Sequence, residues 1–297
     1  MDYVSFQQTR SARLVEWQSG EVRRFQDDLV AEEPLQICLG ELPLTVTLRT
    51  PGHDLELAAG FLFTEGIIRT REQILSLKHC RQTSQGLVEI GGRDEPGGSS
   101  DEASGNVVRV ELAAGAVPGI ERIRRNFVAT ASCGICGKAS IESVRVRGIR
   151  TPNPDFRIAP EILIQLAEKM RSAQAVFART GALHAAALFD ARGELIVLRE
   201  DIGRHNAVDQ VVGWAVLEGG IPLSQYAMMV SGRGGFEIVQ KAAVAGTPVV
   251  ASVSAPSSLA VTLARELNLT LAGFLRGSRF LVYSGVERLG LTGAVEP

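Results

Sequence analysis

Residues 226–274 read YAMMVSGRGGFEIVQKAAVAGTPVVASVSAPSSLAVTLARELNLTLAGF, and this stretch decides the fold class. Short runs rich in Val, Ala and Leu alternate with longer segments whose apolar residues recur at helical spacing, in the order 226–230, 236–245, 248–253, 259–267 and 270–274. Gly- and Ser-rich turns separate most of them. Strands that alternate with helices are typical of a sheet with parallel strands. The stretch therefore predicts an α/β fold.

The same pattern extends to both sides of this stretch. Apolar segments at 182–189 and 195–199 flank the turn DARG and predict a β-hairpin. A helical segment follows at 205–217, and one more strand is predicted at 280–283. Pro160 stands where a helix can start, and apolar residues at helical spacing continue to Phe177. We expect one helix from Pro160 that ends at Gly181.

The first half of the chain has a different composition. It predicts strands at 35–39, 43–48 and 107–112 and one helix at 54–66. Residues 91–105 are expected to form a mobile loop or hairpin tip. The prolines of TPNPDF at 151–156 mark the expected domain boundary. We therefore expect three parts: an N-terminal arm or added edge strand at 1–29, a smaller α+β domain at 30–150, and an α/β domain at 151–297.

Composition and charge narrow the class of protein. Of the 297 residues, 45% are hydrophobic and 22% charged, which excludes a disordered or collagen-like chain. The net charge of −2 gives no bulk attraction to nucleic acid. The start, MDYVSFQQTR, does not resemble a secretory signal, and no run of 18 apolar residues occurs. We expect a cytoplasmic protein with no membrane span and no nucleic-acid partner.

Four polar loops follow predicted strands: DIGRHN, SGR, SAPSS and RGSR, at 201–206, 231–233, 254–258 and 276–279. The carboxyl ends of parallel strands meet at one edge of a sheet, where ligands bind. Helix N-termini and arginines at such an edge favour phosphates. The loops together predict a phosphorylated ligand, although in any single loop Gly and Ser can simply make turns and caps. Neither GxGxxG nor GxxxxGK[ST] occurs, so this is not an ordinary Rossmann or Walker site.

The pair Cys133 and Cys136 stands among small residues in ATASCGICGKAS. Between Glu121 and Arg150 there are seven basic and two acidic residues, so the thiols lie in a basic segment of a slightly acidic protein. Nearby cations favour the thiolate and raise reactivity. In a reduced compartment, such a pair indicates chemistry rather than a structural disulfide.

Three kinds of site remain open for the pair. A structural zinc site needs two more ligands, and the candidates, which do not repeat the spacing, are Cys38, His53, His79, Cys80 and His184. A redox dithiol of the thioredoxin type is less favoured, because no Trp precedes the pair and no Pro lies within it. A nucleophilic sulfur carrier needs one essential cysteine and a helper. Cys38 and Cys80 are expected to be inert core residues.

Several blocks of sequence resemble the formate dehydrogenase accessory sulfurtransferase family (FdhD). They are EEPLQI at 32–37, TPGHDLELAAGFLFTEGII at 50–68, SCGICGKAS at 132–140, TGALHAAAL at 180–188, EDIGRHNAVDQVVG at 200–213, the stretch 231–264, and FLRGSRFLVYS at 274–284. The resemblance covers most of residues 30–284. The IGRHNAVD and CGxCG blocks together are its most specific part.

The resemblance implies a function. Members accept sulfur from an L-cysteine desulfurase as a cysteine persulfide and transfer it to a molybdenum bis(guanine dinucleotide) cofactor, bound as substrate, before its insertion into formate dehydrogenase. By the match, Cys133 is the persulfide carrier and Cys136 the second cysteine. The family's nucleotide-contacting motif falls on Phe274, Leu275, Arg276, Gly277, Ser278 and Arg279. The resemblance also implies a homodimer, and a three-layer mixed sheet like that of the cytidine deaminase fold.

Two histidines need separate treatment. His184 lacks the glutamate that a zinc deaminase has two positions later, since Ala186 stands there, and the Cys pair lies upstream instead of downstream. A deaminase is therefore disfavoured, and we expect His184 to be buried or at a strand edge. His205 is expected to contact the cofactor, or else to cap a helix with Asn206. The full set of further predicted cofactor contacts is Asp201, Arg204, His205, Asn206, Ser231 and Arg233.

Two alternative functions stay open. One is a chaperone that binds the molybdenum cofactor and does not need its thiols. The other is a zinc-binding CxxC protein. For the sulfur carrier itself we expect no structural metal, and its expected partners are the desulfurase, formate dehydrogenase and a second copy of the chain.

Overall fold

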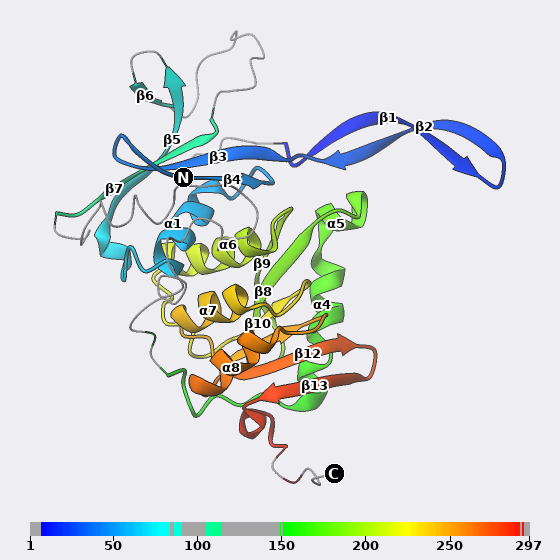
Figure 1. Ribbon diagram of the computed structural model, residues 1–297, viewed down its shortest axis with the longest axis vertical. Coiled ribbons are helices and arrows are strands. Elements are labelled where there is room, and N and C mark those ends of the chain that lie inside the picture. The colour runs from blue at the N-terminus through cyan, green and yellow to red at the C-terminus, as the bar shows by residue number, and fades with distance from the viewer. Residues whose placement is uncertain are drawn as a thin grey trace.

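The computed structural model describes residues 7–83, 86–90, 105–114, 149, 151–291 and 293. Within these ranges the chain forms a mixed α/β structure with two larger sheets and a separate two-stranded hairpin (Figure 1). No helix in the described part of the chain has the length and apolar character needed to cross a membrane.

The larger sheet has six strands in the order β13-β12-β11-β10-β8-β9. Their bounds are β8 His184–Phe189, β9 Leu195–Asp201, β10 Ala227–Val230, β11 Val249–Ser252, β12 Thr270–Arg276 and β13 Arg279–Ser284. β10, β11 and β12 are parallel neighbours, whereas β8 is antiparallel to both β10 and β9. Strands β9 to β12 therefore all run in one direction, as the alternation of strands and helices predicts.

Helices cover both faces of this sheet. One face packs against α6 Arg204–Leu217, α7 Phe236–Val244 and α8 Ser258–Glu266. The other face packs against α3 Pro160–Leu163 and α4 Leu166–Ala173, together with the 3₁₀ turn η3 Val286–Leu289. Successive residues of β10 alternate between these two cores, Met228 in the first and Met229 in the second, as expected for a strand buried on both sides. The predicted three-layer arrangement is confirmed, and the likeness to cytidine deaminases stays a prediction.

The second sheet belongs to the first half of the chain and has the order β4-β3-β7-β5-β6. Its elements are β3 Glu33–Leu39, β4 Leu42–Arg49, β5 Ile74–Thr83, β6 Gly86–Glu89 and β7 Val107–Leu112, with α1 Asp54–Thr64 and the 3₁₀ turn η1 Arg71–Gln73 between them. Its inner face and α1 join the same apolar core as α6 and α7. The core therefore runs without interruption across the expected boundary at residue 150.

Helices α1 and α6 approach each other unusually closely. A Cβ atom at Gly213 would lie 1.8 Å from the backbone oxygen of Glu56, and one at Gly60 would lie 1.8 Å from the backbone oxygen of Asp209. Only glycine fits at both positions, because any side chain would push the helices apart. The crossing fixes α6, and hence one part of the sheet edge, against the N-terminal half of the chain.

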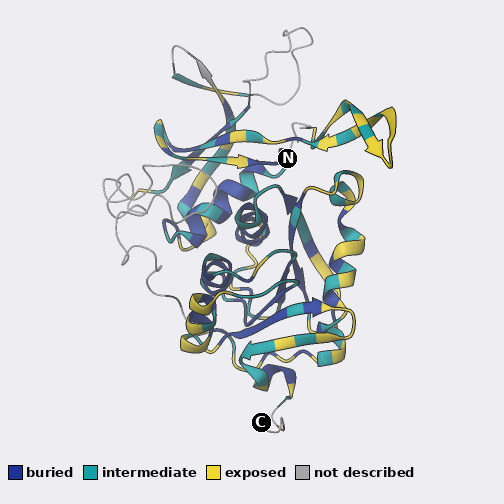
Figure 2. Cartoon of the chain, turned by 45° about the vertical axis from the view of Figure 1, so that its right-hand side comes forward, coloured by how far each residue is buried: buried dark blue, intermediate teal, exposed yellow. Residues whose placement is uncertain are grey.

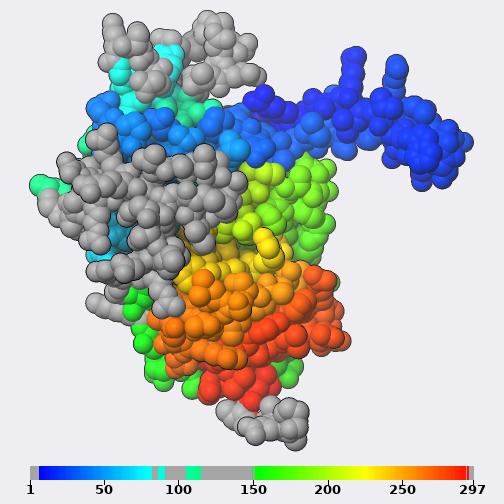
Figure 3. Space-filling model, viewed as in Figure 1, coloured from blue at the N-terminus to red at the C-terminus, as the bar shows by residue number. Residues whose placement is uncertain are grey.

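The hairpin of β1 Thr9–Gln18 and β2 Glu21–Val30 projects from the body as an arm (Figures 1 and 3). Within the described residues, its strands pair only with each other. Ser19 and Gly20 both have positive φ, as a tight hairpin turn requires. Exposed residues occupy most of the arm, and Trp17 is 72% exposed (Figure 2). Within the expected arm at 1–29, residues 9–29 therefore belong to a β-hairpin.

One predicted helix is divided. The expected helix from Pro160 to Gly181 forms as α3, α4 and α5 Ala175–Thr180, with breaks after Leu163 and at Gln174. The carboxylate of Glu200, at the end of β9, accepts hydrogen bonds from the N–H groups of Val176 and Phe177 at 3.0 and 2.8 Å. This cap from a distant strand stabilises a new helix start, so the prediction of one continuous helix is wrong.

Candidate functional site at the edge of the six-stranded sheet

The carboxyl ends of β9, β10, β11 and β12 lie at one edge of the large sheet, because these strands run in the same direction. The loops that follow β9, β10 and β11 lead into α6, α7 and α8, and the turn after β12 leads into β13. This edge is called the rim below. The expectation that the four polar loops converge on one edge is therefore confirmed.

A cluster of basic side chains occupies the rim beside β8 and β10. His184 begins β8 and pairs across the hairpin with Asp201, so it lies next to the start of α6. A Cβ atom at Gly232 would lie 3.5 Å from His184 Nδ1 and 3.6 Å from Arg204 Cδ, which places the loop after β10 against both side chains. Arg233 is exposed on that same loop.

Both histidines of this region are held neutral. Burial, reinforced by the charges of Arg204 and Arg233, lowers the pKa of His184. Burial, together with Arg204 and Lys241 and with smaller effects of His184 and Arg233, lowers the pKa of His205 to about 3. The Nε2 atom of His205 lies 3.1 Å from a carboxylate oxygen of Glu237 on α7. At neutral pH the positive charge of the rim therefore resides on the arginines.

Arg204 and Arg233 have no ionic partner among the residues that the structure describes. Within the described residues, neither Arg204 nor Arg233 forms an ion pair or a side-chain hydrogen bond. The helices that start beside them, α6 and α7, have Gly203 and Gly235 as their N-cap residues and therefore no side-chain cap. By contrast, Ser257 caps α8 by accepting from the N–H of Ala260 at 3.3 Å. Uncapped helix N-termini and unpaired guanidinium groups both favour an anion.

Asp201 and Asn206 both form hydrogen bonds within the protein. Asp201 is fully buried, and its carboxylate accepts from the N–H groups of Gly203 and Thr50 and from the side chains of Asn206 and Gln210, at 2.7, 3.1, 2.9 and 2.9 Å. Burial raises its pKa to about 7, and the four donors oppose that effect. No atom of this carboxylate is exposed to a guanine, so direct base contact by Asp201 does not fit this arrangement.

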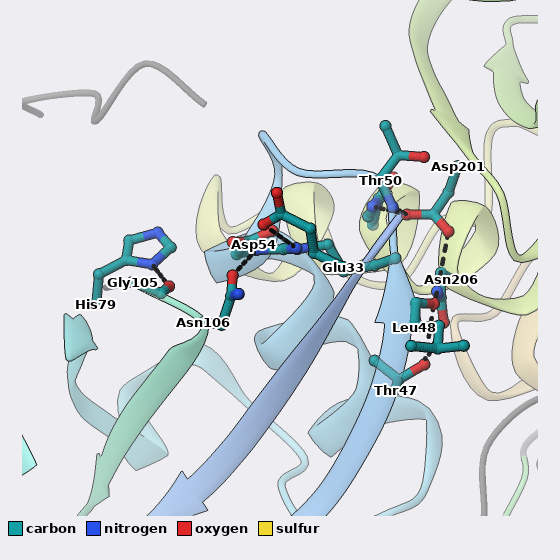
Figure 4. Close-up of polar contacts among 12 residues, drawn as sticks. Glu33, Thr47, Leu48, Thr50, Asp54, His79, Gly105, Asn106, Asp201 and Asn206 are labelled. Carbon is teal, nitrogen blue, oxygen red and sulfur yellow. Dashed lines mark hydrogen bonds and ion pairs between the residues drawn. The ribbon is translucent and has the colours of Figure 1, made fainter. Parts of the chain in front are cut away.

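Asn206 also links the start of α6 to the end of β4 (Figure 4). Its amide nitrogen also donates to the carbonyl oxygen of Leu48 at 2.7 Å, and Thr47 donates to its amide oxygen at 3.2 Å. Asn206 and Asp201 thus tie the start of α6 to the end of β4. The N-cap of α6 is Gly203, so the alternative in which Asn206 caps this helix is wrong.

Ser231 is also engaged by the protein itself. Its hydroxyl accepts from the N–H of Ala185 at 2.8 Å, and its own N–H donates to the carbonyl of Ala185 at 2.9 Å. These two bonds extend the β8–β10 pairing by one residue and place the SGRGG loop beside His184. Its contact with a cofactor stays a prediction.

The turn between β12 and β13 carries the predicted nucleotide motif. Phe274 adopts a left-handed φ of 55° where the register shifts, a conformation that costs energy for a side chain of this size. Leu275 beyond it is buried, whereas the following four residues, Arg276 to Arg279, are exposed. The Nε of Arg276 donates to the carbonyl of Val253 at 3.2 Å, and Arg276 pairs with Arg279 across the strands. Two arginines therefore stand on an exposed turn at the far end of the rim.

The reactive cysteine pair lies outside the described residues, as do the basic segment 121–150, except Ile149, and nearly all of the loop 91–105. Cys38 and Cys80 are described and belong to one small cluster on the N-terminal sheet. Both are free and fully buried, and burial raises the pKa of each thiol. The expectation that these two are core residues is confirmed. Among the described side chains, no group of three His, Cys, Asp or Glu is placed to hold a metal ion.

Sequence reasoning missed two parts of this region. One is His184, which belongs to the basic cluster. The observation that could have indicated this is its position opposite Asp201 in the hairpin. Lys241 on α7 lies buried below the rim, where its Nζ donates to both carboxylate oxygens of Asp209 and to the hydroxyl of Thr64, each at 2.9 Å. Although burial opposes the charge, Asp209 and Glu65 raise the pKa of Lys241.

Comparison with known proteins identifies the family of the chain. Residues 30–290 match the model of the FdhD/NarQ family. The chain belongs to the FdhD/NarQ family. It is 46% identical over 290 residues to the sulfur carrier protein FdhD of Streptomyces avermitilis, covering 96% of this chain and 97% of that protein. The FdhD of Mycobacterium tuberculosis is 46% identical over 264 residues, with 89% and 92% covered.

The FdhD/NarQ fold is also seen in a solved structure. The crystal structure of a proposed formate dehydrogenase accessory protein from Desulfotalea psychrophila matches with a TM-score of 0.68. It covers 95% of this chain and 100% of that chain, at 23% sequence identity. At this identity the match establishes the fold.

Proposed function

We propose that this chain is a sulfur carrier that serves the maturation of formate dehydrogenase. The observation that carries the proposal is the match, over nearly the full chain, to family members named sulfur carrier protein FdhD. The family match at residues 30–290 spans Cys133 and Cys136. The basic sequence around these two residues suits a thiolate, which is the form that attacks sulfur.

In the proposed reaction Cys133 takes sulfur from an L-cysteine desulfurase. The Cys133 thiolate attacks the terminal sulfur of the donor persulfide, so that a new S–S bond forms while the donor's S–S bond breaks and the donor leaves as a thiolate. The S–S bond of the Cys133 persulfide then breaks: its terminal sulfur bonds to the metal of the molybdenum bis(guanine dinucleotide) cofactor, bound as substrate, which supplies two electrons, and Cys133 is left as a thiolate. Cys136 assists, and no structural metal takes part.

The rim is the proposed place for the cofactor's guanine nucleotides. Arginines without an ionic partner in the described part of the chain, and helix N-termini without a side-chain cap, suit phosphates. The exposed turn from Phe274 to Arg279 offers two further arginines. We place the protein in the cytoplasm, as a homodimer that meets the desulfurase and formate dehydrogenase in turn. The proposal includes a fold of the large sheet like that of cytidine deaminases.

The test is complementation of a strain that lacks the carrier, combined with transfer of labelled sulfur from a desulfurase. Cys133→Ala is expected to abolish both formate dehydrogenase activity and label transfer, and Cys136→Ala to reduce them less. Cys38→Ala, which removes a buried thiol, is the matched control and should retain both. Full activity of a Cys133→Ala, Cys136→Ala variant would instead support a chaperone with dispensable thiols. Equal and complete loss in both single variants, with bound zinc, would support a zinc site.

A further inference from the structure

We propose that one face of the β1–β2 arm binds an acidic surface of the protein that receives the substrate from the rim. This face is called the open face, and it consists of Arg13, Val15, Trp17, Val22 and Arg24. The inference rests on the proposed function in one respect, since that function makes formate dehydrogenase the receiving protein. It adds the surface through which the two proteins meet.

The apolar side chains of the open face are exposed together. Residues directly opposite each other in an antiparallel pair share one face of the hairpin. Trp17 stands opposite Val22, and Val15 lies two positions before Trp17 on the same face. Their exposed fractions are 64% for Val15, 72% for Trp17 and 66% for Val22. Single exposed apolar residues are ordinary, but neighbours that share one face of a projecting arm form a patch that indicates an interaction surface.

The opposite face of the arm is covered by its own side chains. Leu14 and Phe25 stand opposite each other there, and both are only partly exposed. Arg23 lies over the ring of Phe25, with Cζ 5.3 Å from the ring centroid, and its Nε is 2.6 Å from a carboxylate oxygen of Glu16. The arm therefore covers one aromatic side chain and leaves Trp17 exposed. Trp and Arg are enriched among the residues that contribute most of the binding energy in protein interfaces.

The charge of the open face indicates an acidic partner. Arg13 and Arg24 are exposed, and neither forms an ion pair or a side-chain hydrogen bond with another described residue. Asp28, at the base of the arm, pairs with Arg179 of α5. The other acidic residues of the arm lie on the opposite face, and they are Glu16, Glu21 and Asp27. Positive charge around an apolar centre is complementary to an acidic surface with an apolar pocket. Symmetric pairing of two open faces would instead bring arginines against arginines, which disfavours a second copy of the chain as the partner.

The arm starts beside the rim. Arg179 of α5 pairs with Asp28 of β2 and donates to the hydroxyl of Thr9 at 3.2 Å. Helix α5 leads into β8, whose first residue, His184, lies at the rim. Figure 1 shows the arm leaving the body beside α5. An extended strand of this length spans about 30 Å, so the open face reaches well beyond the body of the protein.

This position selects the partner. A protein that takes the substrate from the rim must approach this edge of the sheet, and it then lies within reach of the open face. Under the proposed function that protein is formate dehydrogenase. The desulfurase acts at Cys133 instead, so nothing in its reaction requires it to approach the rim.

The size of the open face suits a transient contact. A surface about 30 Å long and about 10 Å wide covers about 300 Å², or about 600 Å² when both partners are counted. Stable complexes bury about 1,200–2,000 Å², whereas transient encounters bury less. A protein that delivers a substrate must release its partner after each transfer, so a small contact area fits this role.

The test measures binding of the full chain to purified formate dehydrogenase that lacks its molybdenum cofactor, by surface plasmon resonance at low and at physiological ionic strength. Trp17→Ser is expected to weaken binding about 30-fold, as for a residue that dominates an interface. Arg13→Gln, Arg24→Gln should slow association and remove most of the salt dependence, because exposed charges act mainly on the rate of encounter.

Two control variants make comparable changes outside the open face. Arg23→Gln removes a charge from the opposite face of the same arm, where the side chain is 70% exposed. Leu75→Ser replaces an exposed apolar residue of β5. Both should bind formate dehydrogenase like the wild type. Thermal unfolding verifies that each variant is folded, and light scattering should give the same oligomeric state for Trp17→Ser and the wild type.

Several results would overturn the proposal. Wild-type affinity in Trp17→Ser, or an equal loss in either control, would show that the open face does not bind formate dehydrogenase, and would leave the proposed function intact. Dissociation of a wild-type dimer by Trp17→Ser would assign the face to a second copy of the chain. Loss of label transfer from the desulfurase to Cys133 in Trp17→Ser would assign it to the desulfurase.

Failure of the proposed function gives a different pattern. If the wild type does not bind formate dehydrogenase at all, both the proposed partner and the role of the open face are wrong. If Cys133→Ala still activates formate dehydrogenase fully, the sulfur carrier is refuted, whereas loss of binding in Trp17→Ser would still support the open face.

Discussion

Removal of the buried charge of Lys241 is expected to destabilise the protein strongly. Lys241 Nζ contacts both oxygens of Asp209 and the hydroxyl of Thr64 at 2.9 Å, and Glu65 at 3.5 Å. The side chains of Lys241 and Asp209 are only 7% and 4% exposed. Lys241→Met keeps most of the volume of the side chain but leaves a carboxylate buried without its cation.

The magnitude follows from the loss of one partner of a buried ion pair, which costs about 3–5 kcal/mol. In the variant, the carboxylate of Asp209 keeps the hydrogen bond that it accepts from the Thr64 hydroxyl at 2.7 Å. Unfolding entropy of about 2.1 cal/mol/K per residue amounts to about 0.6 kcal/mol/K for a chain of this length. A loss of about 4 kcal/mol therefore lowers the melting temperature by about 6 °C.

The assay is thermal and urea unfolding of Lys241→Met beside a control that makes the same substitution at the surface. Lys78 pairs with Glu89 at 2.8 Å, but both side chains are more than 40% exposed, so Lys78→Met should cost less than about 1 kcal/mol. Adding Asp209→Asn to Lys241→Met removes the uncompensated charge and should restore part of the loss. Equal effects of the two Lys→Met substitutions, or a double variant less stable than Lys241→Met, would refute the reasoning.

Three further predictions concern other parts of the molecule. Trp17→Ser should change the free energy of unfolding by less than about 0.5 kcal/mol, because Trp17 is 72% exposed; a large drop in thermal stability would contradict an exposed arm. Gly213→Ala should destabilise by about 2 kcal/mol or more, since its Cβ would lie 1.8 Å from the Glu56 carbonyl, and a wild-type urea midpoint would contradict the close crossing. His205 has a folded pKa of about 3 against its ordinary 6.5, so the unfolded state binds more protons between these values and the contribution of His205 to stability falls as pH falls below 6.5. His205→Gln should flatten the pH dependence of stability in that window, and an unchanged slope would show that this histidine does not titrate as described.

Local patterns in the sequence predicted most strands and helices, because burial repeats every second residue in a strand and every third or fourth in a helix. The division of the helix after Pro160 was not predictable in this way. Its cause is Glu200, whose carboxylate reaches the N–H groups of Val176 and Phe177 from another element. A cap supplied from that distance leaves no local signal in the helix itself.

For the rim, sequence order was informative because loops after parallel strands must meet at one edge. That argument found Arg204, Arg233 and the turn from Phe274 to Arg279, and the strand directions confirm their common edge. It did not separate polar residues whose side chains have no partner among the described residues from those that are bonded within the protein. Asp201 and Asn206 looked like the other polar loop residues, yet both bind the end of β4 instead.

By itself the sequence determined the α/β alternation, the rim loops and the likeness to a family, since periodicity, turn residues and motifs are all local properties of the chain. Only the tertiary structure decided that α1 and α6 cross at glycines, that His184 joins the arginines, and that Asp201 is buried beneath them. The physical reason is that the free energy of a polar side chain depends on which groups surround it. Those groups come from strands and helices that are far apart in the sequence.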